Sequence, residues 1–133
     1  MTNPANTADS EKAALIAELT QAGIKHTPEN IVRIAKRSDG KIVFLELGNI
    51  KSGMQHILSK AAQFAEIGID IDEIPDAVMT AIIEGEVVGT QGKLSETPRQ
   101  IYKFVFKGEF KYMAITVSDN GYIVGANPRS RLR

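Results

Sequence analysis

Apolar residues at helical spacing mark the first ordered part of this chain. Leu15, Leu19 and Ala22 fall on one stripe, and Gly23 is a good helix stop. The pattern predicts an amphipathic helix over 11–22.

Two β-branched runs, 31–36 and 41–47, then flank the turn formers Ser38-Asp39-Gly40. This arrangement is typical of a β-hairpin. The second run is almost entirely apolar, which indicates a strand covered on both faces.

Helical periodicity returns after the predicted hairpin. Apolar residues recur every three or four positions over 53–66 and again over 69–84. We expect a helix in each segment. The second is expected to be capped near Asp72, with Pro75 in its first turn and Gly85 at its end.

The rest of the chain reads as β-structure. The expected elements are a short strand at 87–88, a loop over 89–98, strands at 101–106 and 110–117, a turn at 119–121 and a strand at 122–125.

The pairing register of the second hairpin decides which side chains meet. A three-residue loop at 107–109 would place Tyr102 opposite Ala114 and on the same face as Thr116. A two-residue loop would separate Tyr102 from Thr116. We expect the three-residue loop, because it gathers the aromatic residues of both strands on one face.

This element order predicts an α+β fold, with N-terminal helices packed on a twisted, mostly antiparallel β-sheet. The chain has 133 residues, the size of one ordinary domain. We expect a flexible lead at 1–10, a single domain over 11–128 and a basic tail at 129–133.

Composition narrows the function classes. Cysteine is absent, which excludes a disulfide framework and a thiolate metal site. There is no apolar run long enough for a membrane span, and the first residues lack the order of a signal peptide. The net charge is zero, which is unusual for a protein that binds nucleic acid.

The charge is nevertheless unevenly distributed. From Lys93 to the end, eight Lys or Arg face three acids, whereas 66–86 holds seven acids and no Lys or Arg. This predicts either a dipolar surface or two ordinary solvated faces.

Candidate chemistry centres on the helix that carries His56, one of only two histidines. His56, Lys60 and Gln63 share one helix face, where they could bind phosphate or transfer a proton. An ordinary surface helix would look the same. The other histidine, His26, precedes a Thr-Pro turn and is expected to be structural.

No metal and no cofactor are expected. The acidic run 70–73 lacks the spacing of a known metal motif, and acids are favoured at a helix N-terminus in any case.

Five phrases of the sequence together resemble a known family, from about Gly23 to Pro128. They are Gly40–Glu46 (GKIVFLE), Gly53–Ile57 (GMQHI), Ile82–Gly92 (IIEGEVVGTQG), Arg99–Tyr102 (RQIY) and Thr116–Pro128 (TVSDNGYIVGANP). They resemble C-terminal toxin domains of contact-dependent growth inhibition and related polymorphic toxins, which are similar to the barnase, EndoU, colicin and RelE group of RNases.

The resemblance implies a bacterial toxin that cleaves RNA, often tRNA, without a metal. The ribose 2′-hydroxyl would attack the phosphate and leave a 2′,3′-cyclic phosphate. Such chemistry needs a base, an acid and donors for the phosphate oxygens. The implied catalytic residues are His56, Arg99, Tyr102 and Thr116, and the implied RNA contacts are Lys60, Gln91, Lys93 and Asn120.

The same resemblance implies a cognate immunity protein as partner. It also implies that the domain belongs to a secreted or cell-surface parent protein and acts in the cytoplasm of the target bacterium.

The chain departs from the family pattern one turn after His56. The family has a second histidine there, and Ala61 is the nearest equivalent, with a register uncertain by one residue. We hypothesise either natural divergence or a deliberate change of that histidine to alanine, which would make a lethal toxin expressible.

Two other functions are compatible with the sequence. One is a non-catalytic RNA- or protein-binding relative, favoured by the zero net charge and the missing histidine. The other is a phage-encoded accessory nuclease of the same fold.

Overall fold

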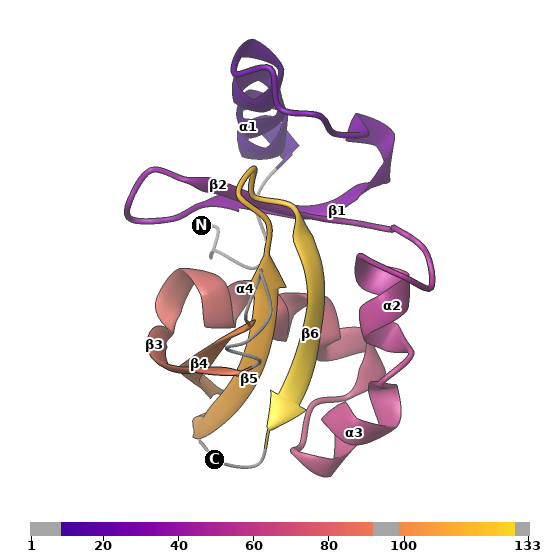
Figure 1. Ribbon diagram of the computed structural model, residues 1–133, viewed down its shortest axis with the longest axis vertical. Helices are drawn as coiled ribbons and strands as arrows, with labels where there is room; N and C mark the ends of the chain where they lie inside the picture. The colour runs from indigo at the N-terminus through magenta and orange to yellow at the C-terminus, as the bar shows by residue number, and fades with distance from the viewer. Residues whose placement is uncertain (1–8, 92–98, 130–133) are drawn as a thin grey trace.

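The computed structural model of this protein describes residues 9–91 and 99–129 (Figure 1). Its fold is α+β, as the sequence predicts, with helices packed on antiparallel β-structure. The elements, in chain order, are α1 (Asp9–Gln21), η1 (Pro28–Asn30), β1 (Ile31–Lys36), β2 (Ile42–Glu46), α2 (Met54–Leu58), α3 (Ala61–Glu66), η2 (Ile71–Glu73), α4 (Ile74–Glu84), β3 (Glu86–Gln91), β4 (Arg99–Phe106), β5 (Glu109–Val117) and β6 (Ile123–Arg129).

Both ends of the described chain are more regular than the sequence predicts. Helix α1 begins at Asp9, inside the segment expected to be a lead. Strand β6 continues to Arg129, because Asn127 pairs with Ala114 and Arg129 pairs with Tyr112. Residues 1–8 and 130–133 lie outside the described residues.

Strands β3–β6 form an antiparallel meander, here called the main sheet. The strand expected at 87–88 is longer than predicted, because β3 pairs with β4 from Glu86 opposite Lys103 to Gln91 opposite Arg99. The predicted loop was therefore wrong for its first residues. Its remainder, 92–98, lies outside the described residues.

The predicted register of the β4–β5 hairpin was wrong. Phe106 pairs with Glu109 and Tyr102 pairs with Met113, so the loop has two residues, Lys107 and Gly108. Both have positive φ, 55° and 79°. Such a turn matches the right-handed twist of the flanking strands. Turn geometry, rather than the grouping of aromatic residues, sets the register.

The helix predicted over 53–66 is two short helices. Helix α2 ends at Leu58 and α3 begins at Ala61. Between them Lys60 has φ −105° and ψ 21°, outside the helical region. The chain turns here while still following the edge strand β6, which both helices contact. Lys60 therefore projects from a bend.

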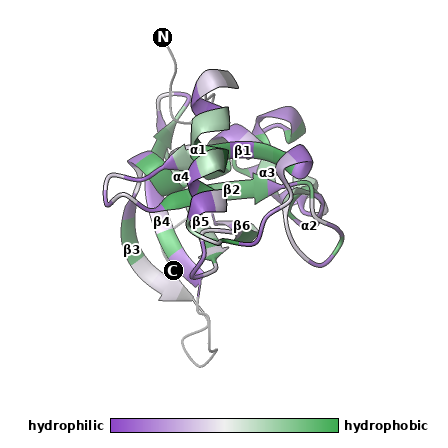
Figure 2. Cartoon of the chain, turned by 90° about the horizontal axis from the view of Figure 1, so that it is seen from above, coloured by the Kyte–Doolittle hydropathy of each residue, from purple (hydrophilic) through white to green (hydrophobic). Residues whose placement is uncertain are grey.

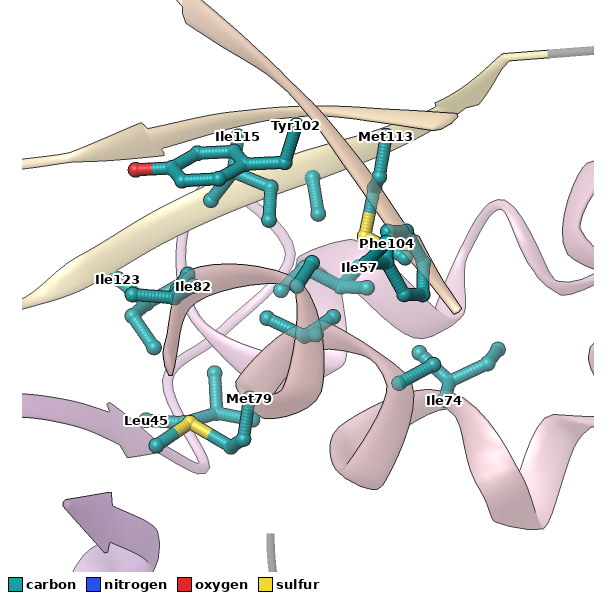
Figure 3. Close-up of a cluster of buried hydrophobic side chains, with 14 of the residues drawn as sticks. Leu45, Ile57, Ile74, Met79, Ile82, Tyr102, Phe104, Met113, Ile115 and Ile123 are labelled. Atoms are coloured by element: carbon teal, nitrogen blue, oxygen red, sulfur yellow. The ribbon is translucent and has the colours of Figure 1, made fainter. Parts of the chain in front are cut away.

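The main core lies between α4 and one face of the main sheet. The second predicted helix corresponds to η2 followed by α4, with Pro75 at its start and Gly85 as its C-cap, but the capping box is formed by Asp70 and Glu73 rather than by Asp72. Apolar side chains of α4 meet Tyr102, Phe104, Met113 and Ile115 of the sheet (Figure 3). The strands carry both hydrophobic and hydrophilic stretches, and the connections are mostly hydrophilic (Figure 2).

The β1–β2 hairpin is confirmed, and it is covered on both faces as expected. Val43 and Leu45 point to the main core, whereas Phe44 and Ile34 belong to a second cluster with Leu19 of α1. Helix α1 lies on the far side of the hairpin from α4 (Figure 1). The Phe44 amide donates to the carbonyl of Gly121 at 2.9 Å, which joins the hairpin to the β5–β6 turn.

Candidate active site

The outer face of the main sheet, opposite α4, brings together several of the predicted residues. Cross-strand pairs share a face. Thr116 pairs with Gly125, and the β4–β5 register continues to place Arg99 level with Thr116. The next row holds Ile101, Ala114 and Asn127. Ile101 and Ala114 are buried and give this face an apolar floor.

His56 reaches this outer face from helix α2, which flanks β6. An ideal Cβ placed on Gly125 would lie 3.2 Å from His56 Cδ2 and 3.5 Å from Nε2, so the ring lies directly on the glycine. The His56 Nδ1 lies 2.8 Å from the carbonyl oxygen of Ile50. A carbonyl only accepts, so Nδ1 carries the proton and Nε2 is the nitrogen that a substrate can use.

A tight loop holds the Ile50 carbonyl in place. Asn49 Oδ1 accepts hydrogen bonds from the backbone amides of Lys51, at 2.8 Å, and Ser52, at 3.3 Å. Gly48 and Gly53, with φ of 63° and 84°, begin and end the loop, and a Cβ on Gly48 would clash with the Ser52 carbonyl. The loop therefore fixes the position of the Ile50 carbonyl, which in turn orients the His56 ring.

Lys60 reaches the same face from the bend between α2 and α3. Its Nζ donates a hydrogen bond to Oδ1 of Asn127, in the row next to His56 and Gly125. Burial lowers the pKa of Lys60, and the positive charge of Arg99 lowers it further. The two cations therefore lie close enough to repel each other.

Arg99 has an unusual buried nitrogen. Within the described part of the chain, its Nε is the one buried side-chain nitrogen or oxygen without a hydrogen-bond partner. A buried donor without a partner is costly, and in native proteins such a group is explained by strain, a catalytic role, or a bound water or ion. A phosphate bound between Arg99 and Lys60 would relieve the repulsion between the two cations.

Tyr102 lies apart from these groups, on the inner face. Its ring is buried in the main core, and its hydroxyl donates to Gln100 Oε1 at 3.0 Å. Burial raises the pKa of this hydroxyl, although nearby Arg37 partly opposes the effect. The two-residue hairpin loop separates Tyr102 from Thr116, as expected for that register. The structure thus brings together His56, Lys60, Arg99 and Thr116, but not Tyr102.

The other predicted RNA-contacting residues are Gln91, Lys93 and Asn120. Lys93 lies outside the described residues, and of Gln91 only the backbone pairing with Arg99 is described. Asn120 lies in the β5–β6 turn, where its Oδ1 accepts from the Tyr122 amide at 3.1 Å.

Asn120 instead lines a cavity of about 240 Å³ between β2, this turn and the segment after α1. The cavity is lined by Lys25, His26, Thr27, Glu46, Ser118, Asn120 and Tyr122. Its main polar groups already bond within the fold: His26 Nδ1 to the Ile24 carbonyl at 2.7 Å, and Glu46 to the Thr27 amide at 2.8 Å. His26 also lies edge-on to Phe44, which supports its expected structural role.

Ala61, the position of the hypothesised missing histidine, packs against the main core. Its neighbour Lys60 is the residue that reaches the outer face one turn after His56. The one-residue uncertainty in register therefore matters, because Lys60, and not Ala61, is placed beside Asn127 on the outer face.

Three contributors to the site were missed by sequence reasoning. They are Gly125, which makes room for the His56 ring, Asn127, which holds Lys60, and the carbonyl of Ile50. The period-two spacing of Gly125 and Asn127 indicates a shared strand face. The contact of that face with α2 depends on tertiary structure.

The described residues contain no group of three or more His, Cys, Asp or Glu side chains that could hold a metal ion. None of the described helices is long and apolar enough to cross a membrane. A comparison of the sequence with protein-family models finds no match, and neither does a comparison with curated proteins.

Proposed function

We propose that this chain is an endoribonuclease that works without a metal ion, by attack of a ribose 2′-hydroxyl on the adjacent phosphate. The observation that carries the proposal is the grouping of His56, Lys60 and Arg99 on one face of the main sheet. Thr116 adds a hydroxyl in the same row.

We assign each residue a role that its position allows. Arg99 binds the scissile phosphate, and Thr116 donates to one of its oxygens. His56 Nε2 takes the proton of the attacking 2′-hydroxyl, because Nδ1 is already used on the Ile50 carbonyl. The new P–O2′ bond forms as the P–O5′ bond breaks, which leaves a 2′,3′-cyclic phosphate.

Lys60 donates the proton that the departing 5′-oxygen requires. Its lowered pKa makes its ammonium group a stronger acid than an ordinary lysine. Its charge also stabilises the negative charge that builds on the phosphorane.

In this proposal the domain is the toxin part of a growth-inhibition protein, and tRNA is its target. An immunity protein would block the outer face with an acidic surface that complements Lys60 and Arg99. This context rests on the sequence resemblance alone.

Expression in bacteria, with total RNA on a denaturing gel, tests the proposal. We expect growth arrest and discrete RNA fragments from the wild-type chain, and neither from His56→Ala. Ala61→His tests the missing-histidine hypothesis separately: it predicts greater toxicity, and unchanged toxicity would count against it. Intact RNA from both the wild-type chain and Ala61→His would contradict the proposed nuclease activity.

A non-catalytic RNA-binding protein is the second candidate. The observation that favours it is that His56 is the one histidine on the described outer face, with a lysine in place of a second imidazole. This candidate predicts RNA binding that depends on Arg99 with no strand cleavage.

A further inference from the structure

We propose that the outer face continues past the catalytic cluster as a track for single-stranded RNA, in which Phe110 stacks on a base several nucleotides from the cleaved bond. This inference rests on the proposed function, because it assigns the same site a longer substrate.

Phe110 is the feature that calls for an explanation. Its side chain is 66% exposed, although it stands on a regular strand directly opposite Val105. The Nζ of Lys103 lies 4.5 Å from the centre of its ring. An exposed phenyl ring with a cation over it resembles the stacking platforms on which bases of single strands lie.

The register places Phe110 on the same face as the catalytic cluster. Lys103 pairs with Tyr112, and Ile101 pairs with Ala114, so one face of the strands extends in register from Phe110 to Thr116, with the buried side chains of Ile101 and Ala114 as its floor. At about 3.3 Å per strand residue, Phe110 lies roughly 20 Å from Thr116. That separation is too long for one nucleotide, so Phe110 would meet a base remote from the reacting phosphate.

The chemistry of the face favours RNA over a protein as its occupant. Lys60, Arg99 and Lys103 give it positive charge at both ends, and cations along a groove track a phosphate backbone. Among the described strand residues in register on this face, Glu86 is the one acid, and it stands at the outer edge opposite Lys103. Tyr112 adds a second aromatic ring beside Lys103.

The test measures binding of a 2′-O-methyl oligonucleotide of about eight residues by fluorescence anisotropy, since blocked 2′-oxygens cannot attack. Phe110→Ala should weaken binding about 10-fold, whereas Phe110→Tyr, which keeps the ring, should bind like the wild type. Val105→Ala is the matched control, because Val105 is an exposed neighbour without a ring and should leave affinity unchanged.

Cleavage assays complete the test. Phe110→Ala should raise KM for the long RNA while leaving cleavage of a dinucleotide unchanged. Equal affinity of the wild type and Phe110→Ala would overturn the track, and so would an equal loss from Val105→Ala. If Phe110→Ala abolishes self-association in sedimentation but not RNA binding, the ring is a protein contact and the track is wrong.

The two proposals can fail separately. RNA binding that depends on Phe110, without any cleavage, would contradict the nuclease activity and support the RNA track. Cleavage with equal KM by the wild type and Phe110→Ala would support the nuclease activity and contradict the RNA track.

Discussion

The two faces of the main sheet are built from alternate residues of the same strands, yet they have opposite chemistry. On the inner face Tyr102, Phe104 and Met113 are buried against α4. On the outer face the same strands carry Arg99, Lys103 and Thr116 around a small apolar floor. Neighbours in sequence should therefore differ in what they contribute: inner residues to stability, outer residues to RNA binding and cleavage.

The largest expected effect is on the outer side. His56→Ala should reduce RNA cleavage by about 10³-fold, since a positioned acid or base contributes 10²–10⁴-fold. The melting temperature should change little, because His56 lies outside both core clusters. Initial rates and a thermal melt measure the two effects.

His26→Gln is the matched control for this change, because it alters the other histidine. It should leave the cleavage rate intact. Equal losses from the two substitutions would mean that neither histidine acts in the reaction as described.

Substitutions on the inner face should lower the free energy of unfolding. Phe104→Ala should lower the free energy of unfolding by about 3–5 kcal/mol, because it removes a buried ring from the main core. The adjacent Lys103→Ala on the outer face should change it by less than about 0.5 kcal/mol. Urea denaturation measures both values, and similar losses would contradict the separation of the faces.

The fold was predicted from sequence wherever local chemistry decides it. The Asp39-Gly40 turn, Pro75 and Gly85 marked the first hairpin and α4 correctly. The second hairpin was mispredicted because Lys107, an ordinary residue, adopts a positive φ that no sequence pattern announces. The register error then moved Tyr102 to the wrong face.

The candidate site was predictable only in part, for a related reason. His56 and Lys60 were singled out as residues on one helix face, and both do reach the outer face. The helix is in fact broken between them. Their partners Gly125 and Asn127 belong to strand β6, and Lys60 and Asn127 are separated by 67 positions in the sequence. Contacts over such distances depend on tertiary packing.

A smaller effect is expected at Gly125. Gly125→Ala would place a Cβ 3.2 Å from His56 Cδ2, so the ring must shift and cleavage should fall about 10-fold. In a His56→Ala background the same change should cost nothing further. A double-mutant cycle on the cleavage rate measures this coupling, and additive losses would show that Gly125 acts independently of the ring.

The pH dependence offers a more subtle test of the outer face. If Lys60 donates the proton, cleavage should fall at high pH as Lys60 loses its charge, below the range of an ordinary lysine, because burial and Arg99 lower its pKa. Arg99→Gln removes the second cause, so the pKa should rise and the alkaline limb should move to higher pH. If Arg99→Gln lowers the cleavage rate at every pH but leaves the alkaline limb in place, the proposed coupling between Arg99 and Lys60 is wrong.

The smallest effect is expected at Tyr102. Tyr102→Phe keeps the buried ring and removes the hydroxyl that donates to Gln100, so unfolding free energy should fall by about 1 kcal/mol. The cleavage rate should be unchanged, because the hydroxyl serves the inner face. A loss of cleavage with normal stability would show that the Tyr102 hydroxyl takes part in cleavage.

The most direct test of the account is the product of cleavage by the purified chain in excess EDTA. The substrate is an RNA oligonucleotide with a single 2′-deoxy residue at the preferred position, compared with its all-ribose version. We predict a 2′,3′-cyclic phosphate from the all-ribose substrate, no cleavage at the 2′-deoxy residue and no product from His56→Ala. Cleavage at the 2′-deoxy residue, or products ending in a 3′-hydroxyl, would contradict the account.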